Sequence, residues 1–540
     1  MADKVIKSNA VFTGLGEEPF AGGIAIEGNK IAAVCPGDEI DKYVGEGTEV
    51  FEYGDNLIMP GLVDAHNHLW WGACADSPYM VNLAETKTKE EALKLIKEFA
   101  SANPELPRVC GFGWMLGQWG ETAEFPVKED LDAVVPDRPA YMLNGDCHSA
   151  WLNSMGIEEA GYRADIIIDG GSIGIGADGT PNGQVFEPAA LEYAWNKVYD
   201  YTPEQVRNII GGFMKGLAQQ GVTCISEMSA DDYVDLYHNR YKSFKMLDEE
   251  GVLTTRIHVY TRLFGLTDFS EAKEWQKEFC SPRFALKGLK GFVDGVTSTR
   301  TAALLEPYSD MPETCGIAAP LITQYDLNAC VIAGNKAGLP ARLHCIGDKA
   351  VRMALDAFEE SIKVNGRHGL PNSVEHIESI HPNDIPRFKE LDVIASLQGE
   401  HLPQENNDKL ARIGEERCRY EWPFRSLMDA GADMAFGTDF PVVNYNQFPG
   451  IYASIARRNY DGSIAGLDNG EKLTLAEALS TNTLGSAKAY GRQDELGSLE
   501  AGKLADIIVL DSNLFAEPEE AIKDAKVVLT IMDGNVTYKA

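Results

Sequence analysis

The most constraining feature of this sequence is a rhythm in which short apolar runs alternate with amphipathic helical stretches. This rhythm is typical of βα units around a parallel sheet, whose strands are covered on both faces. The helical candidates 88–100, 202–220 and 474–483 carry apolar residues at three- and four-residue spacing and begin at a threonine that can cap them. Eight apolar runs qualify as strands, namely 62–66, 222–227, 256–260, 288–293, 341–345, 373–377, 393–397 and 433–438.

Eight such units predict an α/β fold, a (β/α)8 TIM-like barrel, for which about 250 residues is usual. The first strand together with 222–485 has roughly that length. The chain has 540 residues and is 44% apolar, which excludes a disordered chain, a collagen-like repeat and a small disulfide scaffold. We therefore expect the barrel to span 59–485, with further structure beside it.

The two ends of the chain carry similar hairpin patterns. Near the start, 23–34 consists of two apolar runs joined by Glu27-Gly28-Asn29, and near the end 526–538 has the same form around Asp533-Gly534-Asn535. Neither end alone has enough strands to bury a face. We expect one small β-sandwich domain, built from 1–58 and 486–540.

The stretch from about 70 to 200, after the first barrel strand, does not fit the βα rhythm. It contains six of the eight tryptophans and a glycine-rich run at 169–176, which lacks the strand-to-helix GxGxxG pattern of a nucleotide loop. An insertion at this point extends from the C-terminal face of a barrel, where βα loops carry function. We expect it to be a substrate lid, or a lid with an ordinary core.

Charge and cysteine usage limit the partners. The balance of 48 Lys and Arg against 82 Asp and Glu gives a net charge of −34, and no basic block occurs, so neither nucleic acid nor a membrane surface is expected as a partner. Ten cysteines form no CxxC pair, and the N-terminus has no signal-peptide core. A cytoplasmic protein is expected.

Histidines and a carboxylate close several of the predicted strands. His66 and His68 end the first strand two residues apart, so period two sends both side chains to one face. His344, His376 and Asp439 close three later strands. Taken alone, each histidine could be a satisfied core residue. Five such positions at the C-terminal ends favour a metal site.

Lys290 lies on the fourth predicted strand. A lysine that faces a barrel interior is unfavourable as a cation, because desolvation disfavours the charged form. Its neutral amine could react with CO₂ to give a carbamate, an anionic ligand able to bridge two cations. The alternative is a lysine that snorkels to solvent or pairs with Asp294.

These motifs resemble those of the amidohydrolase superfamily, and within it the YtcJ-like branch of amidohydrolase family 3 that includes N-substituted formamide deformylases. The resemblance covers nearly the whole chain. The matching segments are Pro60-Gly-Leu-Val-Asp-Ala-His66-Asn-His68, Asp146-Cys-His148-Ser-Ala-Trp-Leu-Asn153, 294–308, His344-Cys-Ile-Gly-Asp348, Glu375-His376, Gly437-Thr-Asp439 and 497–506.

The resemblance implies a ligand set. His66 and His68 would bind the more buried metal, His344 and His376 the more exposed one, and a carboxylated Lys290 would bridge them. Since some relatives use one metal and an unmodified fourth-strand position, one or two ions are expected, with Glu227 as a substitute ligand. Zn²⁺ suits these donors, although Mn²⁺ and Fe²⁺ can occupy the same ligands.

The resemblance also implies a mechanism. A divalent ion lowers the pKa of a bound water from about 15.7 towards 7. Asp439 would touch a metal, take the proton and deliver it to the leaving nitrogen. A metal or His148 would stabilise the negative charge that grows on the carbonyl oxygen.

Three residues are candidates for substrate binding, and each has a structural alternative. His148 lies in the insertion, and a structural role is equally expected. Trp114 could line an apolar pocket or belong to a lid core, and the adjacent Met115 replaces the acidic residue that relatives tend to have. Arg300 could meet a substrate carboxylate or pair with a nearby acid.

The sequence therefore predicts a metal-dependent hydrolase that cleaves a non-peptide carbon–nitrogen bond in an N-acyl, N-formyl or cyclic amide. Deamination of a small ring is disfavoured, because no Glu closely follows His344. A non-catalytic scaffold on the same fold is disfavoured by the complete ligand set. The expected partners are a small-molecule amide substrate and, in a homodimer, a second copy of the chain.

Overall fold

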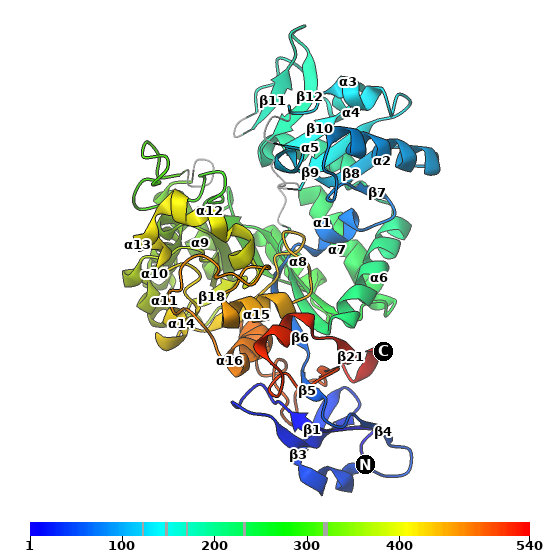
Figure 1. The fold of residues 1–540 in the computed structure, drawn as a ribbon, viewed down its shortest axis with the longest axis vertical. Coiled ribbons are helices and arrows are strands. Elements are labelled where there is room, and N and C mark those ends of the chain that lie inside the picture. Colours follow the sequence, from blue (N-terminus) through cyan, green and yellow to red (C-terminus); the bar gives the residue numbers. More distant parts are fainter. Residues whose placement is uncertain (121–123, 146–148, 169–170, 230–233, 317–321) are drawn as a thin grey trace. The chain divides into compact units, whose positions relative to one another are not determined.

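The computed structural model describes residues 1–540 except 121–123, 146–148, 169–170, 230–233 and 317–321 (Figure 1). The chain divides into two compact units. The first comprises Met1–His68, Met214–Ala230 and Phe244–Ala540, and the second comprises Leu69–Phe213 and Asp231–Ser243. The domain boundaries expected at 59 and 485 stay predictions.

The first unit contains a parallel eight-stranded barrel, as the sequence predicts. Its strands are hydrogen-bonded in the order β19-β18-β17-β16-β15-β14-β13-β6. Each barrel strand except the last, β19, is therefore paired with the barrel strand that comes next in the sequence. The two end strands meet where the backbone N–H of Asp439 donates to the carbonyl of His66 at 2.7 Å. The strands are β6 (Leu62–Asn67), β13 (Val222–Glu227), β14 (Arg256–Arg262), β15 (Phe284–Phe292), β16 (Ala341–Cys345), β17 (Ser373–His376), β18 (Ile394–Leu397) and β19 (Met434–Phe436).

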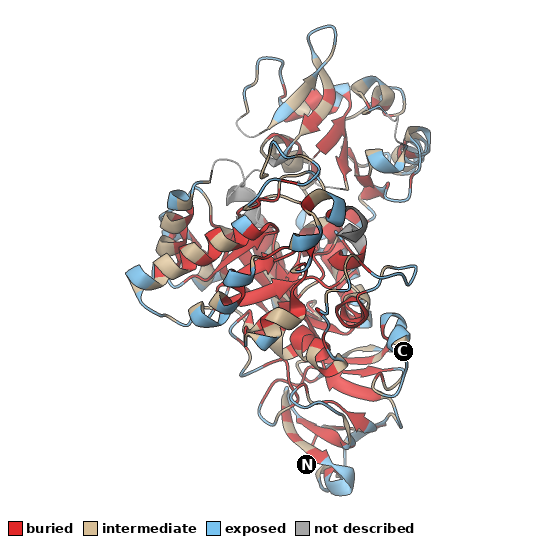
Figure 2. Cartoon of the chain, turned by 60° about the vertical axis from the view of Figure 1, so that its left-hand side comes forward, coloured by how far each residue is buried: buried red, intermediate tan, exposed pale blue. Residues whose placement is uncertain are grey.

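Buried carboxylates hold the strand ends of the barrel. Asp64 accepts hydrogen bonds from the backbone N–H and the hydroxyl of Thr438, at 3.0 and 2.6 Å, and so ties β6 to the segment after β19. Asp294 accepts from three backbone N–H groups, those of Ala303, Ile346 and Gly347, at 2.8–2.9 Å. These bonds fix the loops that carry the candidate ligands. Figure 2 shows the concentration of buried residues in the strands.

Helices connect the strands, and threonine caps begin several of them. Thr323 forms a capping box with Asp326, and Thr474 forms one with Glu477. Thr474 begins a helical segment close to the predicted one, although the segment continues through a π-helical turn at Thr481–Gly485 into α17. The helices are α6 (Pro203–Gln219), α7 (Val234–Glu249), α8 (Ser270–Glu278), α9 (Gln324–Lys336), α10 (Asp348–Asn365), α11 (Ile385–Leu391), α12 (His401–Ile413), α13 (Glu415–Cys418), α14 (Phe424–Asp429), α15 (Phe448–Ala456), α16 (Leu475–Ser480) and α17 (Ser486–Lys488).

Both chain termini contribute to a second sheet of the first unit. β20 (Ile507–Leu510) pairs antiparallel with β5 (Leu57–Pro60), and the order is β22-β21-β20-β5-β1-β2-β3, with β4 paired to β1. The pairings define one sheet, and the expected sandwich of two sheets stays a prediction. The other strands are β1 (Lys4–Val11), β2 (Phe20–Glu27), β3 (Lys30–Pro36), β4 (Glu49–Glu52), β21 (Val527–Met532) and β22 (Asn535–Lys539).

The second unit has its own sheet and its own aromatic core. Its strand order is β11-β12-β10-β9-β8-β7. The rings of Trp114, Trp119 and Trp151 pack against one another, with centroids 5.2–6.5 Å apart. The elements are α1 (Leu69–Ala75), β7 (Met80–Asn82), α2 (Lys89–Ala102), β8 (Val109–Trp114), α3 (Lys128–Asp132), β9 (Ala140–Asn144), β10 (Ser149–Leu152), α4 (Ser154–Ala160), β11 (Ser172–Ile175), β12 (Pro181–Phe186) and α5 (Pro188–Val198).

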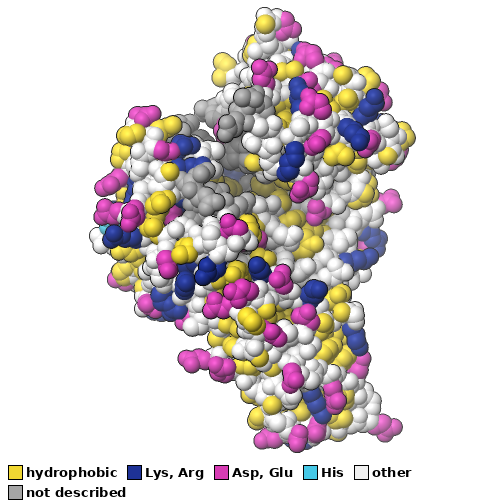
Figure 3. Space-filling model, viewed as in Figure 1, with side chains coloured by type: hydrophobic (Ala, Val, Ile, Leu, Met, Phe, Trp, Pro, Cys, Tyr) yellow, Lys and Arg dark blue, Asp and Glu magenta, His cyan; other side chains and the backbone are white. Residues whose placement is uncertain are grey.

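Charged side chains of both signs are interspersed over the face of the molecule drawn in Figure 3. Among the described residues, no helix combines the length and the apolar character needed to cross a bilayer. The nine cysteines in the described part of the chain are all free thiols.

Candidate metal centre

Asp439 is the residue on which the candidate ligands converge. Its Oδ1 lies 3.3 Å from His66 Nε2 and 3.2 Å from His68 Nε2. Its Oδ2 lies 3.9 Å from His376 Nδ1 and 3.6 Å from His401 Nε2. All five residues are buried. In each of two groups, His66-His68-Asp439 and His376-His401-Asp439, the potential ligand atoms lie within 4.8 Å of one another.

Backbone geometry contributes to this convergence. His376 has φ +76° and Asp439 has φ +60°, both in the left-handed region that non-glycine residues rarely adopt. His376 ends β17 and Asp439 lies three residues after β19 ends, so the chain turns where each side chain must face the centre. Strained residues of this kind persist where the surrounding structure fixes them, and they cluster at functional sites.

His401 is a candidate ligand that was not predicted from the sequence. It is the first residue of α12, four positions after β18 ends, and its ring stacks parallel to that of His376 with centroids 6.1 Å apart. The available indication was a further histidine soon after a barrel strand. The strand-end pattern did not include it, because it follows Gly399 and Glu400 in a loop.

The structure places His344 next to the centre but outside both ligand groups. Its ring centroid is 4.4 Å from that of His376, while its Nε2 lies 3.3 Å from the carbonyl oxygen of Gly295. A neutral imidazole can donate one hydrogen bond, and Gly295 is an acceptor for it. The expected role of His344 as a ligand stays a prediction.

Lys290 is buried beside the first ligand group. Its Nζ lies 3.3 Å from His66 Nε2 and 5.0 Å from the centroid of the Phe292 ring. The side chain is 1% exposed, so it does not snorkel to solvent. No hydrogen bond or ion pair joins Lys290 to Asp294 in the described part of the structure, because Asp294 is engaged by backbone N–H groups. Burial lowers the pKa of Lys290 to about 8.

A buried carboxylate and a buried guanidinium hold His66. Glu375 Oε2 lies 2.7 Å from His66 Nδ1, and Arg342 binds both oxygens of Glu375 at 2.8 and 3.0 Å. A carboxylate on Nδ1 fixes the tautomer that leaves Nε2 free for a metal. Arg342 also donates to Ser226 at 2.9 Å and Ser396 at 3.3 Å. Glu375 belongs to one of the matching sequence segments and Arg342 to the predicted strand 341–345, but neither residue was assigned a role from the sequence.

The donor set fits a divalent cation. Burial and the nearby charge of Lys290 lower the pKa of His66 to about 4 and that of His344 to about 3. Burial and His344 hold the pKa of His376 well below its usual value. These imidazoles are therefore neutral near pH 7, which is the metal-binding form. Within the described residues, buried His376 Nε2 makes no hydrogen bond.

The electrostatics of Asp439 also fit a ligand. Burial would raise the pKa of its carboxyl group, but the surrounding histidines, His66 foremost, hold it well below its usual value. It is thus an anion at neutral pH. Nitrogen and carboxylate ligands of this kind suit Zn²⁺.

Among the described residues, neither ligand group includes Arg300, Glu227 or Trp114. Arg300 donates to Asp310 at 2.5 Å, and Glu227 accepts from the backbone N–H of Ser229 at 2.8 Å. Trp114 is fully buried in the core of the second unit, where its indole N–H donates to the carbonyl of Met142 at 3.0 Å. His148 lies outside the described residues. Their expected roles in binding stay predictions.

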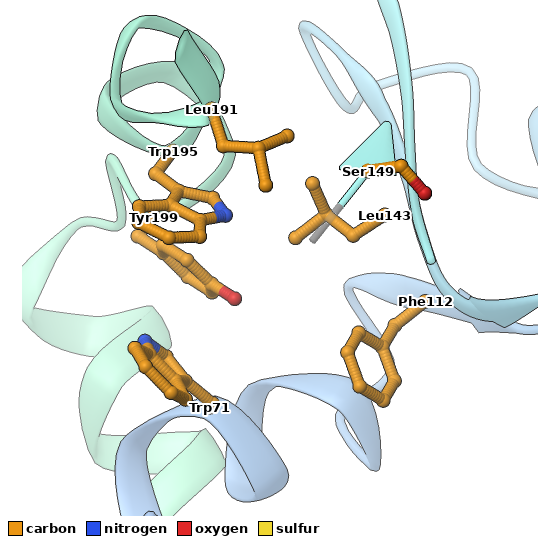
Figure 4. A pocket seen from close by; sticks show the side chains of 7 residues that line it. All are labelled: Trp71, Phe112, Leu143, Ser149, Leu191, Trp195 and Tyr199. Atoms are coloured by element: carbon orange, nitrogen blue, oxygen red, sulfur yellow. The ribbon is translucent and has the colours of Figure 1, made fainter. Parts of the chain in front are cut away.

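The second unit contains a small apolar pocket (Figure 4). Trp71, on α1, and Trp195, on α5, face each other at a centroid distance of 6.0 Å. Figure 4 shows Leu143 and Phe112 on the other side of the pocket from these two helices. The pocket is lined by Trp71, Phe112, Leu143, Ser149, Leu191, Trp195 and Tyr199. It shows that the aromatic residues of the insertion enclose a space within that unit.

Comparisons with known proteins agree with this geometry. The model of a family described as the amidohydrolase family matches residues 50–538. The chain is 28% identical to the Protein LONG AFTER FAR-RED 3 of Arabidopsis thaliana, over 100% of this chain and 92% of that protein. It is 25% identical to the putative amidohydrolase YtcJ of Bacillus subtilis, over 92% of each chain. It is 24% identical to the N-substituted formamide deformylase of Arthrobacter pascens, over 100% of this chain and 99% of that protein.

A solved structure shares the same fold. An uncharacterized metal-dependent hydrolase from Pyrococcus furiosus superposes with a TM-score of 0.76 at 27% sequence identity. The match covers 94% of this chain and 99% of that one.

Proposed function

Since the chain belongs to the amidohydrolase family, we propose that it is a metal-dependent hydrolase that cleaves a non-peptide carbon–nitrogen bond, with an N-acyl, N-formyl or cyclic amide as substrate. The observation that carries the proposal is the convergence of four buried histidines on Asp439. The likeness to an N-substituted formamide deformylase over the whole chain supports the choice of bond.

The residues of the centre have distinct parts in this reaction. A bound divalent cation supplies an acidified water and an electrostatic partner for the charge on the carbonyl oxygen. Asp439 is ionised and can accept a proton from the attacking water, then pass it to the leaving nitrogen. Glu375 keeps the His66 ring in one orientation and one tautomer. Burial of all these groups strengthens their electrostatic effect, because little water screens them.

Lys290 would supply a bridging ligand as a carbamate. Its amine lies beside His66, and its lowered pKa increases the share of the neutral form that can react with CO₂. The carbamate would turn a cation that opposes metal binding into an anion that favours it. We propose Zn²⁺ as the metal on the strength of the imidazole and carboxylate donors.

Metal content tests the proposal first. Protein purified without chelators should contain metal, and Lys290→Ala should lose a clear part of it. Lys287→Ala is the matched control, because this half-buried lysine lies on the same strand and should leave the metal content unchanged. Wild-type protein free of metal would contradict the proposal and favour a scaffold.

Activity tests the bond type. Purified protein should hydrolyse members of a panel of N-formyl and N-acyl amines and cyclic amides, with release of an amine or a ring-opened acid. Release of ammonia from ring amidines or aminopyrimidines, with no amide hydrolysis, would contradict the amide assignment and support deamination. Cytoplasmic location and a homodimer are also proposals, and the free cysteines are compatible with a reducing compartment.

A further inference from the structure

We propose that His401 is a metal ligand, which with His376 and Asp439 forms a second metal position, and that Glu378 and Lys409 orient it. The inference rests on the proposed function, because it requires that the chain bind a divalent cation. It extends that function by a ligand that comes from α12 rather than from the end of a barrel strand.

The direction of the His401 ring is the first argument. Its Nε2 lies 3.6 Å from Asp439 Oδ2, on the side of the carboxylate opposite to the one that His66 and His68 approach. The side chain of His401 is 6% exposed. A buried imidazole that points at a buried carboxylate oxygen, with a second imidazole beside it, supplies three ligand atoms of the types that Zn²⁺ takes.

His376 has one ring nitrogen available as a ligand. Its Nδ1 lies 2.8 Å from Gln398 Oε1, an oxygen that can only accept, so Nδ1 carries the proton. Nε2 then keeps the lone pair, and in the described part of the chain this buried atom makes no hydrogen bond. A metal would satisfy an otherwise costly buried acceptor.

A buried ion pair behind His401 repeats the arrangement behind His66. Glu378 Oε1 lies 3.7 Å from His401 Nδ1, and Lys409 Nζ lies 2.5 Å from Glu378 Oε2. Lys409 is fully buried and sits 4.0 Å from the centroid of the Trp422 ring. On the other side, Glu375 contacts His66 Nδ1 and is paired with Arg342. Each histidine thus has a carboxylate on its Nδ1 side, in hydrogen-bond contact for His66 and farther away, at 3.7 Å, for His401. Each carboxylate is backed by a buried cation, and each ring turns Nε2 towards Asp439.

An ion pair with only a structural role would not need to place its carboxylate next to a histidine that faces Asp439. Burying charged pairs is costly, and an apolar pair of similar volume is often at least as stable. The cost is easier to explain where the carboxylate has a task at the histidine, since carboxylates on metal-bound histidines fix the ring and raise its basicity. His344 differs, because both the Gly295 carbonyl oxygen, at 3.3 Å, and Asp294 Oδ1, at 3.8 Å, approach its Nε2 rather than its Nδ1.

Zinc binding to the purified full-length chain tests the inference. Metal-free protein is equilibrated with Zn²⁺ at buffered free concentrations, and the number of ions per chain and their dissociation constants are measured by atomic emission and by competition with a chelating dye. We expect His401→Asn to raise the dissociation constant of the more weakly bound ion. The rise should be at least about tenfold to hundredfold, which is the loss caused by removing a group that is hydrogen-bonded to a metal ligand. Glu378→Gln should raise the same dissociation constant by about tenfold.

Two histidine variants serve as comparisons. His368→Asn is the matched control, because His368 lies before β17, at the opposite end of the barrel from the ligands, and should leave every dissociation constant unchanged. His344→Asn should weaken zinc binding less than His401→Asn, because its Nε2 faces Gly295. Circular dichroism checks the fold of each variant. If His401→Asn does not fold, Glu378→Gln and the visible spectrum of its Co²⁺ complex decide in its place.

The outcomes separate the inference from the proposed function. Zinc binding by His401→Asn with the wild-type number of ions and unchanged dissociation constants would overturn the inference and leave the proposed function intact. The same holds if Glu378→Gln, used as the substitute, binds zinc and Co²⁺ as the wild type does. Wild-type protein that binds no zinc would overturn both.

Discussion

The two sides of Asp439 differ in how the chain builds them. On the Oδ1 side, His66 and His68 come from one strand end, two residues apart. On the Oδ2 side, His376 comes from the end of β17 and His401 from the start of α12, so the pair exists only in the folded chain. The first side is therefore a local pattern, while the second is a product of tertiary structure.

The supports behind the two sides also differ. Arg342 grips both oxygens of Glu375 and donates to serines on two other barrel strands. Lys409 has Glu378 and the face of Trp422. A guanidinium with five donors in a fixed fork holds a carboxylate more rigidly than an ammonium does. We infer that the Oδ1 side is the more rigid of the two, and the following variants test this in order of expected effect.

Asp439→Asn should have the largest effect, because it removes the one anion common to both sides. The amide cannot take a proton, so turnover should fall by about 10²–10⁴. It also keeps one acceptor oxygen instead of two, so at least one of the two sides should bind metal more weakly. Steady-state turnover and metal content measure the two effects. Asp433→Asn, which only breaks a half-exposed pair with Lys488, is the control and should change neither.

Removal of the buried cations should separate the two sides by stability. Arg342→Met leaves Glu375 unpaired in the barrel interior and should lower the free energy of unfolding by about 3–5 kcal/mol. Lys409→Met should cost less within that range, because fewer polar partners are lost. Denaturant unfolding of metal-free protein measures both. The double variant Lys409→Met with Glu378→Leu should recover most of the loss, and a larger effect of Lys409→Met than of Arg342→Met would contradict the proposed difference in rigidity.

The difference between the two sides explains how far the sequence could predict the structure. The eight barrel strands could be predicted because buried parallel strands are continuous apolar runs. The pair His66 and His68 could be predicted because period two puts both on one face. Glu375 and His376 are neighbours that would point apart in a regular strand, and only the positive φ of His376 lets both serve the centre.

Other features could not be predicted from the strand-end pattern. His401 lies four residues beyond its strand, at the start of α12, so that pattern does not reach it. The pairing of Glu378 with Lys409 joins residues 31 positions apart, and nothing in either neighbourhood marks them as partners. The contact of Lys290 with His66 could not be predicted either. Asp294, the partner nearer in the sequence, accepts hydrogen bonds from backbone N–H groups instead.

Gln398→Leu tests the Oδ2 side by a smaller change. Leucine has a similar volume but cannot hold the Nδ1 proton of His376, so the ring loses its fixed tautomer. We expect the zinc affinity of the position on the Oδ2 side to fall by about tenfold to hundredfold, while the affinity of the position on the Oδ1 side stays unchanged. Zinc competition measures both constants. An equal loss at the two positions would show that the sides are not independent.

Ser229→Ala makes the corresponding change on the Oδ1 side and should have the smallest effect. The Ser229 hydroxyl lies 3.4 Å from His68 Nδ1, which is long for a hydrogen bond, so its contribution belongs at the low end of about 0.5–1.5 kcal/mol. A loss of about 0.5 kcal/mol corresponds to a fall of about twofold in the zinc affinity of the position on the Oδ1 side. Zinc competition against wild type and Gln398→Leu measures the difference. A loss of zinc affinity larger than that of Gln398→Leu would contradict this comparison. It would mean that His68 depends on its hydrogen-bond partner more than His376 does, and that the geometry of one strand is not enough to hold His66 and His68 in place.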